Sequence, residues 1–123
     1  MSYDLGLCDP LTGNELELDA PHQMKGGTYQ VGGCSRAHLN VTYNYSPHLY
    51  RVIAGENEHD GGLRLLYGKT GAESIPILEN AITQLADDVD DDYWEPTEGN
   101  AKRALKQLLA LAQMRPDGVW RGD

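Results

Sequence analysis

The chain has 123 residues, of which 40% are hydrophobic, and 19 acidic side chains against 10 lysines and arginines give it a net charge of −9. This length suits one domain, residues 1–123, because two half-sized domains could not each bury a stable core. An acidic chain lacks the basic footprint of a protein that binds nucleic acid directly. No stretch approaches the roughly 20 apolar residues of a membrane span, and no export signal is visible, so we expect a cytoplasmic protein with no membrane partner.

Short strands are predicted for the beginning of the chain. Residues 3–7 and 15–18 alternate between apolar and polar side chains, and residues 9–13 between them (Asp-Pro-Leu-Thr-Gly) have the composition of a turn. We therefore expect a hairpin. Two pairs of glycines then bracket residues 28–31, which predicts a further strand with tight turns at both ends.

The strongest strand pattern covers residues 38–45, where apolar and polar side chains alternate strictly until Pro47. Residues 49–53 fit a strand or a helical turn, and the pattern does not decide between them. The composition of residues 55–62 predicts a polar, glycine-rich loop, and residues 63–67 predict another short strand.

Two helices are predicted for the second half of the chain. The first begins at a capping box, Thr70 to Glu73, or at Ser74, and runs to about Leu85. Its expected core residues are Ile77, Leu78, Ala81, Ile82 and Leu85.

The second helix begins at Thr97, and Pro116 stops it. Its apolar stripe recurs at three and four residues and comprises Ala101, Ala104, Leu105, Leu108, Leu111 and Ala112. After Pro116 a turn brings residues 119–120 back to the core. Trp94 and Trp120 flank this helix, and we expect both to anchor its ends to the core. Strands followed by helices predict an α+β fold, with a small antiparallel sheet from the N-terminal half and the two C-terminal helices packed on one face.

The polar face of the strand at residues 38–45 is a candidate ligand site. It carries His38, Asn40, Thr42 and Asn44, which are all uncharged hydrogen-bonding residues. Such groups suit a partly buried polar ligand, because they donate and accept without a large desolvation cost. An exposed face or a face paired with a second subunit is an equal alternative, and we expect a homo-oligomer. The further candidate ligand-binding residues are Arg36, Arg51, Arg64, Lys69 and Asn100.

An acidic run at residues 87–92 is the second candidate. Asp88, Asp90 and Asp92 have the alternate spacing of a calcium loop, but Tyr93 and Gly99 occupy the positions that need glycine and glutamate. A solvated connector between the helices is the better interpretation. Its functional variant is an acidic surface that meets a basic partner or imitates nucleic-acid phosphates.

Motifs for catalysis and for metal binding are missing from the sequence. The four histidines are scattered, and no phosphate loop or nucleophile elbow is present, so we predict no catalytic residue, no metal site and no cofactor. A small hydrolase with His38 or His48 as its base is supported by residue types alone. Cys8 and Cys34 are expected to be reduced, structural thiols.

Two long stretches carry a resemblance to known proteins. They are residues 67–78 (Tyr-Gly-Lys-Thr-Gly-Ala-Glu-Ser-Ile-Pro-Ile-Leu) and residues 91–101 (Asp-Asp-Tyr-Trp-Glu-Pro-Thr-Glu-Gly-Asn-Ala) continued by residues 115–120. With the turn at residues 9–13 and the glycines at 26–27, the chain resembles a family of small proteins encoded by phages and prophages. The resemblance implies a phage accessory protein that acts in the host cell by binding a host component, and it implies no catalytic residue.

Three functions are therefore considered. The first is non-catalytic sequestration of a small polar or anionic ligand, for example a host defence signal. The second is an acidic inhibitor or nucleic-acid mimic that docks on a basic host protein through residues 87–98. The third is the small hydrolase. They are ranked in this order.

Overall fold

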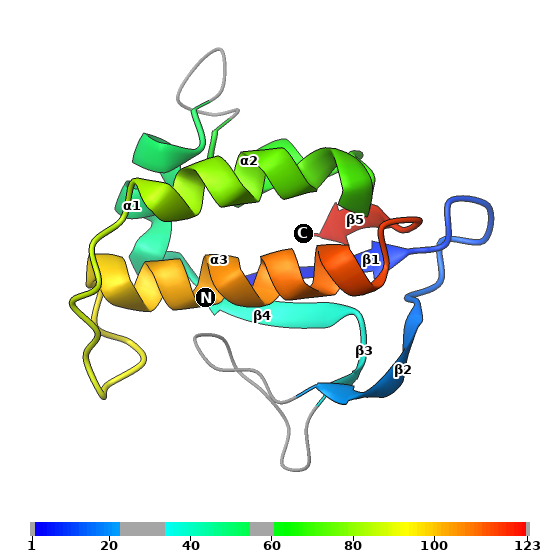
Figure 1. Cartoon of the computed structure of the whole chain (residues 1–123), viewed down its shortest axis with the longest axis horizontal. Helices are drawn as coiled ribbons and strands as arrows, with labels where there is room; N and C mark the ends of the chain where they lie inside the picture. Colours follow the sequence, from blue (N-terminus) through cyan, green and yellow to red (C-terminus); the bar gives the residue numbers. More distant parts are fainter. Residues whose placement is uncertain (1, 23–33, 55–60, 123) are drawn as a thin grey trace.

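The computed structural model describes residues 2–22, 34–54 and 61–122, and the predicted strand at residues 28–31 lies outside these ranges. Strands β1 (Ser2–Cys8), β4 (His38–Thr42) and β5 (Val119–Gly122) form an antiparallel sheet in the order β4-β1-β5. Helices α2 (Gly71–Thr83) and α3 (Glu98–Met114) pack on one face of this sheet (Figure 1). Strands β2 (Glu17–His22) and β3 (Cys34–Arg36) form a separate two-stranded antiparallel sheet. The predicted α+β fold is confirmed.

Strand β1 is the centre of the sheet and shows the expected alternation. Tyr3, Leu5 and Leu7 are buried against the helices, and the register places Leu5 opposite Leu39 and Leu7 opposite Trp120. The predicted hairpin after β1 forms but is short: the Asp9 N–H donates to the Asn14 carbonyl and the Leu16 N–H to the Leu7 carbonyl. Gly13 takes a positive φ of 76°, and one isolated bridge joins Cys8 to Glu15 before β2 leaves to pair with β3.

Helix α3 forms as its sequence predicts. The Thr97 side chain accepts a hydrogen bond from the backbone N–H of Asn100, and the helix ends at Met114, two residues before Pro116. All six residues of the predicted stripe are completely buried. The stripe packs on α2 and β4, and this packing, more than helix propensity, holds the helix.

Helix α2 begins at Thr70, which decides between its two predicted starts. Thr70 and Glu73 form a reciprocal capping box. Ser74 lies inside the helix, where its hydroxyl donates to the Gly71 carbonyl and accepts from the Trp120 indole N–H at 2.8 Å. Leu78, Ala81 and Leu85 are buried, while Ile77 and Ile82 pack at the border of the core.

The C-terminal strand β5 brings Trp120 back to the core, as expected for residues 119–120. Its contribution to the sheet was not predicted, because four residues after a turn carry too short a pattern to identify a strand. Trp120 is completely buried, whereas Trp94 is 53% exposed, so the prediction that both tryptophans anchor α3 is wrong for Trp94.

One predicted strand is shorter than expected, and another is helical. The strand predicted over residues 38–45 ends at Thr42, because the Thr42 hydroxyl accepts from the Asn44 N–H and starts the 3-10 helix η1 (Tyr43–Tyr45). Residues 63–67 lie largely in the 3-10 helix η2 (Gly62–Leu66), which follows a positive φ at Gly62. The open segment at residues 49–53 is mostly helical, within α1 (Ser46–Val52).

Both outer edges of the three-stranded sheet are covered. On β4, the Tyr93 hydroxyl accepts from the Thr42 N–H at 2.9 Å and donates to the Asn40 carbonyl. On β5, the Gly68 N–H donates to the Trp120 carbonyl, and the Trp120 N–H donates to the Lys69 carbonyl. These contacts protect the edges from pairing with another chain.

Cys8 is a free, buried thiol at the end of β1, and burial raises its pKa. The side chain of Cys34 is outside the described part of the chain. Over the ranges that the structure describes, no helix combines the length and the apolar character needed to cross a bilayer.

Candidate functional site

The four residues of the predicted polar strand face have different surroundings. His38 on β4 lies between two carboxylates, 3.2 Å from Glu15 and 3.6 Å from Asp4. Gly6, its partner on β1, leaves room for the backbone before β4 and for Glu15, because a Cβ at Gly6 would lie 2.8 Å from the Ala37 carbonyl oxygen and 3.3 Å from Glu15 Oε2. Asn40 donates to Ser2 and to Asp4 at 2.6 and 2.7 Å. These groups form hydrogen bonds and ion pairs between neighbouring elements of the fold.

The other two residues of this face, Thr42 and Asn44, form hydrogen bonds with residues that follow β4 in the chain. Thr42 is buried and caps η1, and the Asn44 side chain donates to the Trp94 carbonyl at 2.8 Å. Both therefore contact the segment that precedes α3, since the Thr42 N–H also donates to Tyr93.

The four candidate cations are spread over four elements. Arg36 is exposed at the end of β3, and Lys69 lies between η2 and α2. Arg51 forms an ion pair with Glu98 at 2.8 Å. Arg64 lies over the rings of Tyr3 and Tyr43, 5.2 and 5.7 Å from their centroids. The structure does not bring the nine predicted ligand-binding residues together on one surface.

Asn100 is the candidate whose contacts define a site. It is 2% exposed in the first turn of α3, and its side chain makes three hydrogen bonds. Its Oδ1 accepts from the Asp90 N–H, and its Nδ2 donates to the carbonyls of Asp92 and Glu95, all at 3.0 Å. One buried amide thus fixes three points of residues 87–98, which we call the acidic segment.

The alternate aspartates of the acidic segment hold its backbone. Asp88 accepts from the Gly99 N–H, Asp90 from the Asp92 N–H, and Asp92 from the Trp94 N–H, at 2.8–3.1 Å. The bonds of Asp90 and Asp92 are the local side-chain to backbone bonds that aspartate forms in turns, whereas that of Asp88 joins the segment to the start of α3. In the described residues, no three His, Cys, Asp or Glu side chains are placed to hold a metal ion. The spacing that resembles a calcium loop is therefore explained by turn formation.

Gly99 allows the acidic segment to approach the helix. A Cβ at this position would lie 2.6 Å from backbone atoms of Asp88 and Val89, a distance that real Cβ atoms do not show. Only glycine lets the segment pass so close to the start of α3.

Tyrosines anchor the other side of the segment. The Tyr45 hydroxyl donates to the Tyr93 carbonyl, and the two rings meet edge to face at 5.6 Å. Burial raises the pKa of both phenols. Further bonds reach from α1, where His48 contacts the Pro96 carbonyl at 2.7 Å and Arg51 contacts Glu98. The anchoring that was expected of Trp94 is made by Tyr93.

The surface that results is acidic and carries exposed apolar groups. Trp94 is 53% and Val89 47% exposed. Of the seven acids in the segment, Asp87 pairs with Lys102 at 2.7 Å and Glu98 pairs with Arg51. The bond and charge of Lys102 lower the pKa of Asp87. The remaining five have no cation partner among the described residues; they are Asp88, Asp90, Asp91, Asp92 and Glu95.

The sequence predicted that this segment is acidic and exposed to solvent, but not that hydrogen bonds fix its backbone. Comparison with protein-family models, curated proteins and solved structures gave no match for the chain.

Proposed function

We propose that the protein acts by non-catalytic binding and that the acidic segment docks on a basic surface of a partner protein. The observation that supports this proposal is an exposed indole among five carboxylates that have no cation partner in the described part of the chain, on a loop held by the buried Asn100 amide. Aromatic anchors supply much of the energy of protein interfaces. Opposite charges steer the encounter, and a loop ordered beforehand loses less entropy on binding.

The class of partner follows from charge and from the resemblance to phage proteins. A row of carboxylates presents negative charge much as a nucleic-acid backbone does, so the proposed partner is a basic host protein, such as one that binds nucleic acid. Following the phage resemblance, we propose that this encounter takes place in the cytoplasm of a host cell. That part of the proposal rests on association alone.

The experiment is affinity capture combined with cross-linking. Tagged protein is incubated with bacterial host extract, and a carbodiimide joins carboxylates to nearby lysines. We expect one captured protein whose lysines are linked to Asp91 or Glu95. Capture should fall steeply between about 0.1 M and about 1 M salt, as the screening length drops from about 10 to about 3 Å.

Matched variants decide whether the segment is responsible. Trp94→Ala and Glu95→Gln should abolish or weaken capture, while Glu79→Gln should not, since Glu79 is an exposed acid of α2 outside the segment. Equal capture by all three variants would contradict the proposal.

Sequestration of a small ligand at the predicted strand face stays a prediction with less support. Asn40, Thr42 and Asn44 already bond to Ser2, Asp4, η1 and Trp94. A ligand would have to replace these bonds, which reduces its net gain. The hydrolase alternative gains nothing from His48, whose ring contacts the Pro96 carbonyl.

Self-association also stays a prediction. Because residues 68–69 and Tyr93 bond to the outer edges of β5 and β4, a second copy is not expected to add a strand to the three-stranded sheet. Light scattering at increasing concentration tests it, and a constant monomer mass would contradict it.

A further inference from the structure

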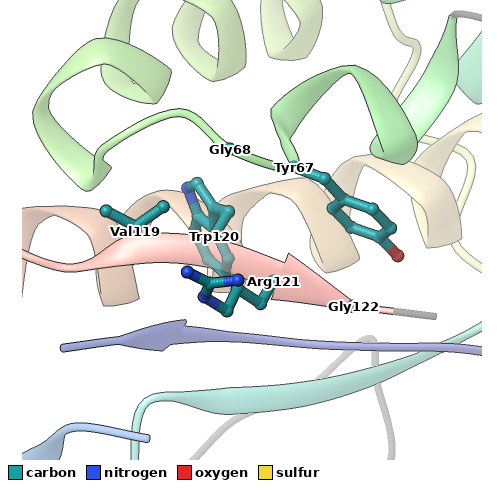
Figure 2. Close-up of a pocket in the computed structure, with 6 residues that line it drawn as sticks. All are labelled: Tyr67, Gly68, Val119, Trp120, Arg121 and Gly122. Carbon is teal, nitrogen blue, oxygen red and sulfur yellow. The ribbon is translucent and has the colours of Figure 1, made fainter. Parts of the chain in front are cut away.

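A cavity of about 220 Å³ lies beside β5, away from the acidic segment (Figures 1 and 2). It is lined by Tyr67, Gly68, Val119, Trp120, Arg121 and Gly122. Figure 2 shows the Arg121 side chain turned back along β5 toward Val119, with the Tyr67 ring at the Gly122 end. The cavity thus combines a cation, a phenol and strand backbone.

Gly122 shapes one end of this cavity. A Cβ there would lie 2.5 Å from Cζ and Oη of Tyr67, so only glycine lets the phenol ring rest against the strand. Gly68 on the facing loop has a φ of +90°, and its N–H bonds to the Trp120 carbonyl. Because Trp120 is completely buried, the loop and the strand form a fixed frame.

A second cation lies next to this frame. Arg64 belongs to η2, which contacts β5, and its guanidinium lies over the rings of Tyr3 and Tyr43. It also donates to the Tyr43 hydroxyl at 3.3 Å. Arg64 is therefore a second positive charge near β5, although it does not line the cavity.

The two arginines differ from other cations of this acidic protein. Arg51, Lys102 and Arg115 each pair with a carboxylate at 2.7–2.8 Å. Within the described ranges, neither Arg64 nor Arg121 has a carboxylate at ion-pair distance. Guanidinium groups that no carboxylate neutralises are suited to bind oxyanions in two-point fashion.

We propose that this cavity binds the phosphate group of a small phosphomonoester or free phosphate, held by Arg121, with the Tyr67 phenol at the other end of the cavity and the positive charge of Arg64 on the neighbouring η2. The volume is below the roughly 300 Å³ at which drug-sized sites begin, so it fits a phosphate group and part of a sugar rather than a whole dinucleotide. This site is independent of the acidic segment and of the function proposed for it.

The test is amide NMR of the full chain with four probes: inorganic phosphate, ribose 5-phosphate, AMP and adenosine. We expect the three phosphate-bearing probes to shift the amides of Gly68 and residues 119–122 in the millimolar range, and adenosine to shift none of them. Tighter binding of the two esters than of inorganic phosphate identifies an esterified ligand, and equal binding identifies free phosphate; both support the site.

Three arginine variants make the test specific. Arg121→Gln should weaken AMP binding by about tenfold, the effect of one charge-assisted hydrogen bond. Arg64→Gln should weaken it less, and Arg51→Gln, which removes a paired arginine elsewhere, should leave it unchanged. Spectra of the free variants establish that each is folded. The proposal is overturned if no phosphate probe binds, if adenosine binds as AMP does, or if Arg121→Gln binds normally.

Discussion

The two tryptophans mark regions that are held in place by opposite means. Trp120 is completely buried and its strand is hydrogen-bonded on both sides, by β1 and by residues 68–70. Trp94 is half exposed, and its loop is held by the amide of Asn100 and by aspartate side chains that bond to the backbone. The β5 region is held in place by a buried apolar side chain, whereas the acidic segment is held in place by hydrogen bonds of polar side chains.

This difference bears on function. A segment fixed by burying its tryptophan has no indole left to offer a partner. A segment fixed by a buried amide keeps its indole and most of its carboxylates at the surface. The second arrangement has the rigidity of a core and the exposure of a loop, which is what a docking surface requires.

The largest predicted effect separates the two tryptophans. Trp120→Ala should lower the free energy of unfolding by about 3–5 kcal/mol, because it leaves a cavity and removes the donor to Ser74. Trp94→Ala should lower it by less than about 1 kcal/mol, because the side chain is half exposed. Denaturant unfolding measures both. Equal losses would show that the two regions are held in the same way.

Removal of the buried amide should give the next largest effect. Asn100→Ala deletes three hydrogen bonds and should cost about 2–3 kcal/mol, since backbone groups of the acidic segment lose their partners. Hydrogen exchange should rise at residues 88–95 while α2 stays protected. Asn80→Ala, at an exposed position of α2, is the control and should change neither. Unchanged exchange in the Asn100 variant would mean that other contacts order the segment.

The helices could be predicted from sequence because their signals are local. The capping box at Thr70, the N-cap at Thr97 and the stripe of α3 are each read within a few turns of chain. The alternation of residues 38–45 continued three residues beyond the real strand, because the Thr42 side chain ends it by capping η1. Residues 63–66 (Leu-Arg-Leu-Leu) are a short and mostly apolar run, and such runs do not distinguish a strand from a helical turn.

The fixed conformation of the acidic segment could not be predicted in the same way. It depends on contacts from Thr42, Tyr45 and His48, which are some 50 residues away along the chain. The one local signal was the alternate aspartates, whose role in turns is visible only with the backbone in place. The cavity beside β5 likewise joins residues 67–68 to residues 119–122, which no local pattern connects.

Alkaline pH should loosen the acidic segment before the β5 region. Burial raises the pKa of Tyr93 and Tyr45 above the ordinary value of 10.0, so the folded protein favours their neutral forms. Their contribution to stability is complete below about pH 10 and is lost as pH rises toward the higher folded-state values. Trp94 fluorescence should report the change, since its ring lies 4.9 Å from the Tyr93 ring. The double variant with Phe at both positions should lose this response; if it responds like the parent, the two phenols are not its cause.

The smallest predicted effect on stability is that of Arg51→Gln. The Arg51–Glu98 pair is about half exposed, and such pairs contribute less than about 1 kcal/mol, so the melting temperature should barely change. Arg51→Gln should strengthen docking on the basic partner, whereas Glu95→Gln should weaken it. Loss of Arg51 leaves Glu98 without its cation and makes the acidic segment more negative, which should strengthen capture of a basic partner at low salt. At about 1 M salt the gain should vanish, because screening removes the added attraction. If Arg51→Gln weakened capture at low salt while the protein stayed folded, charge on the segment would not drive the docking, and the indole alone would have to account for it.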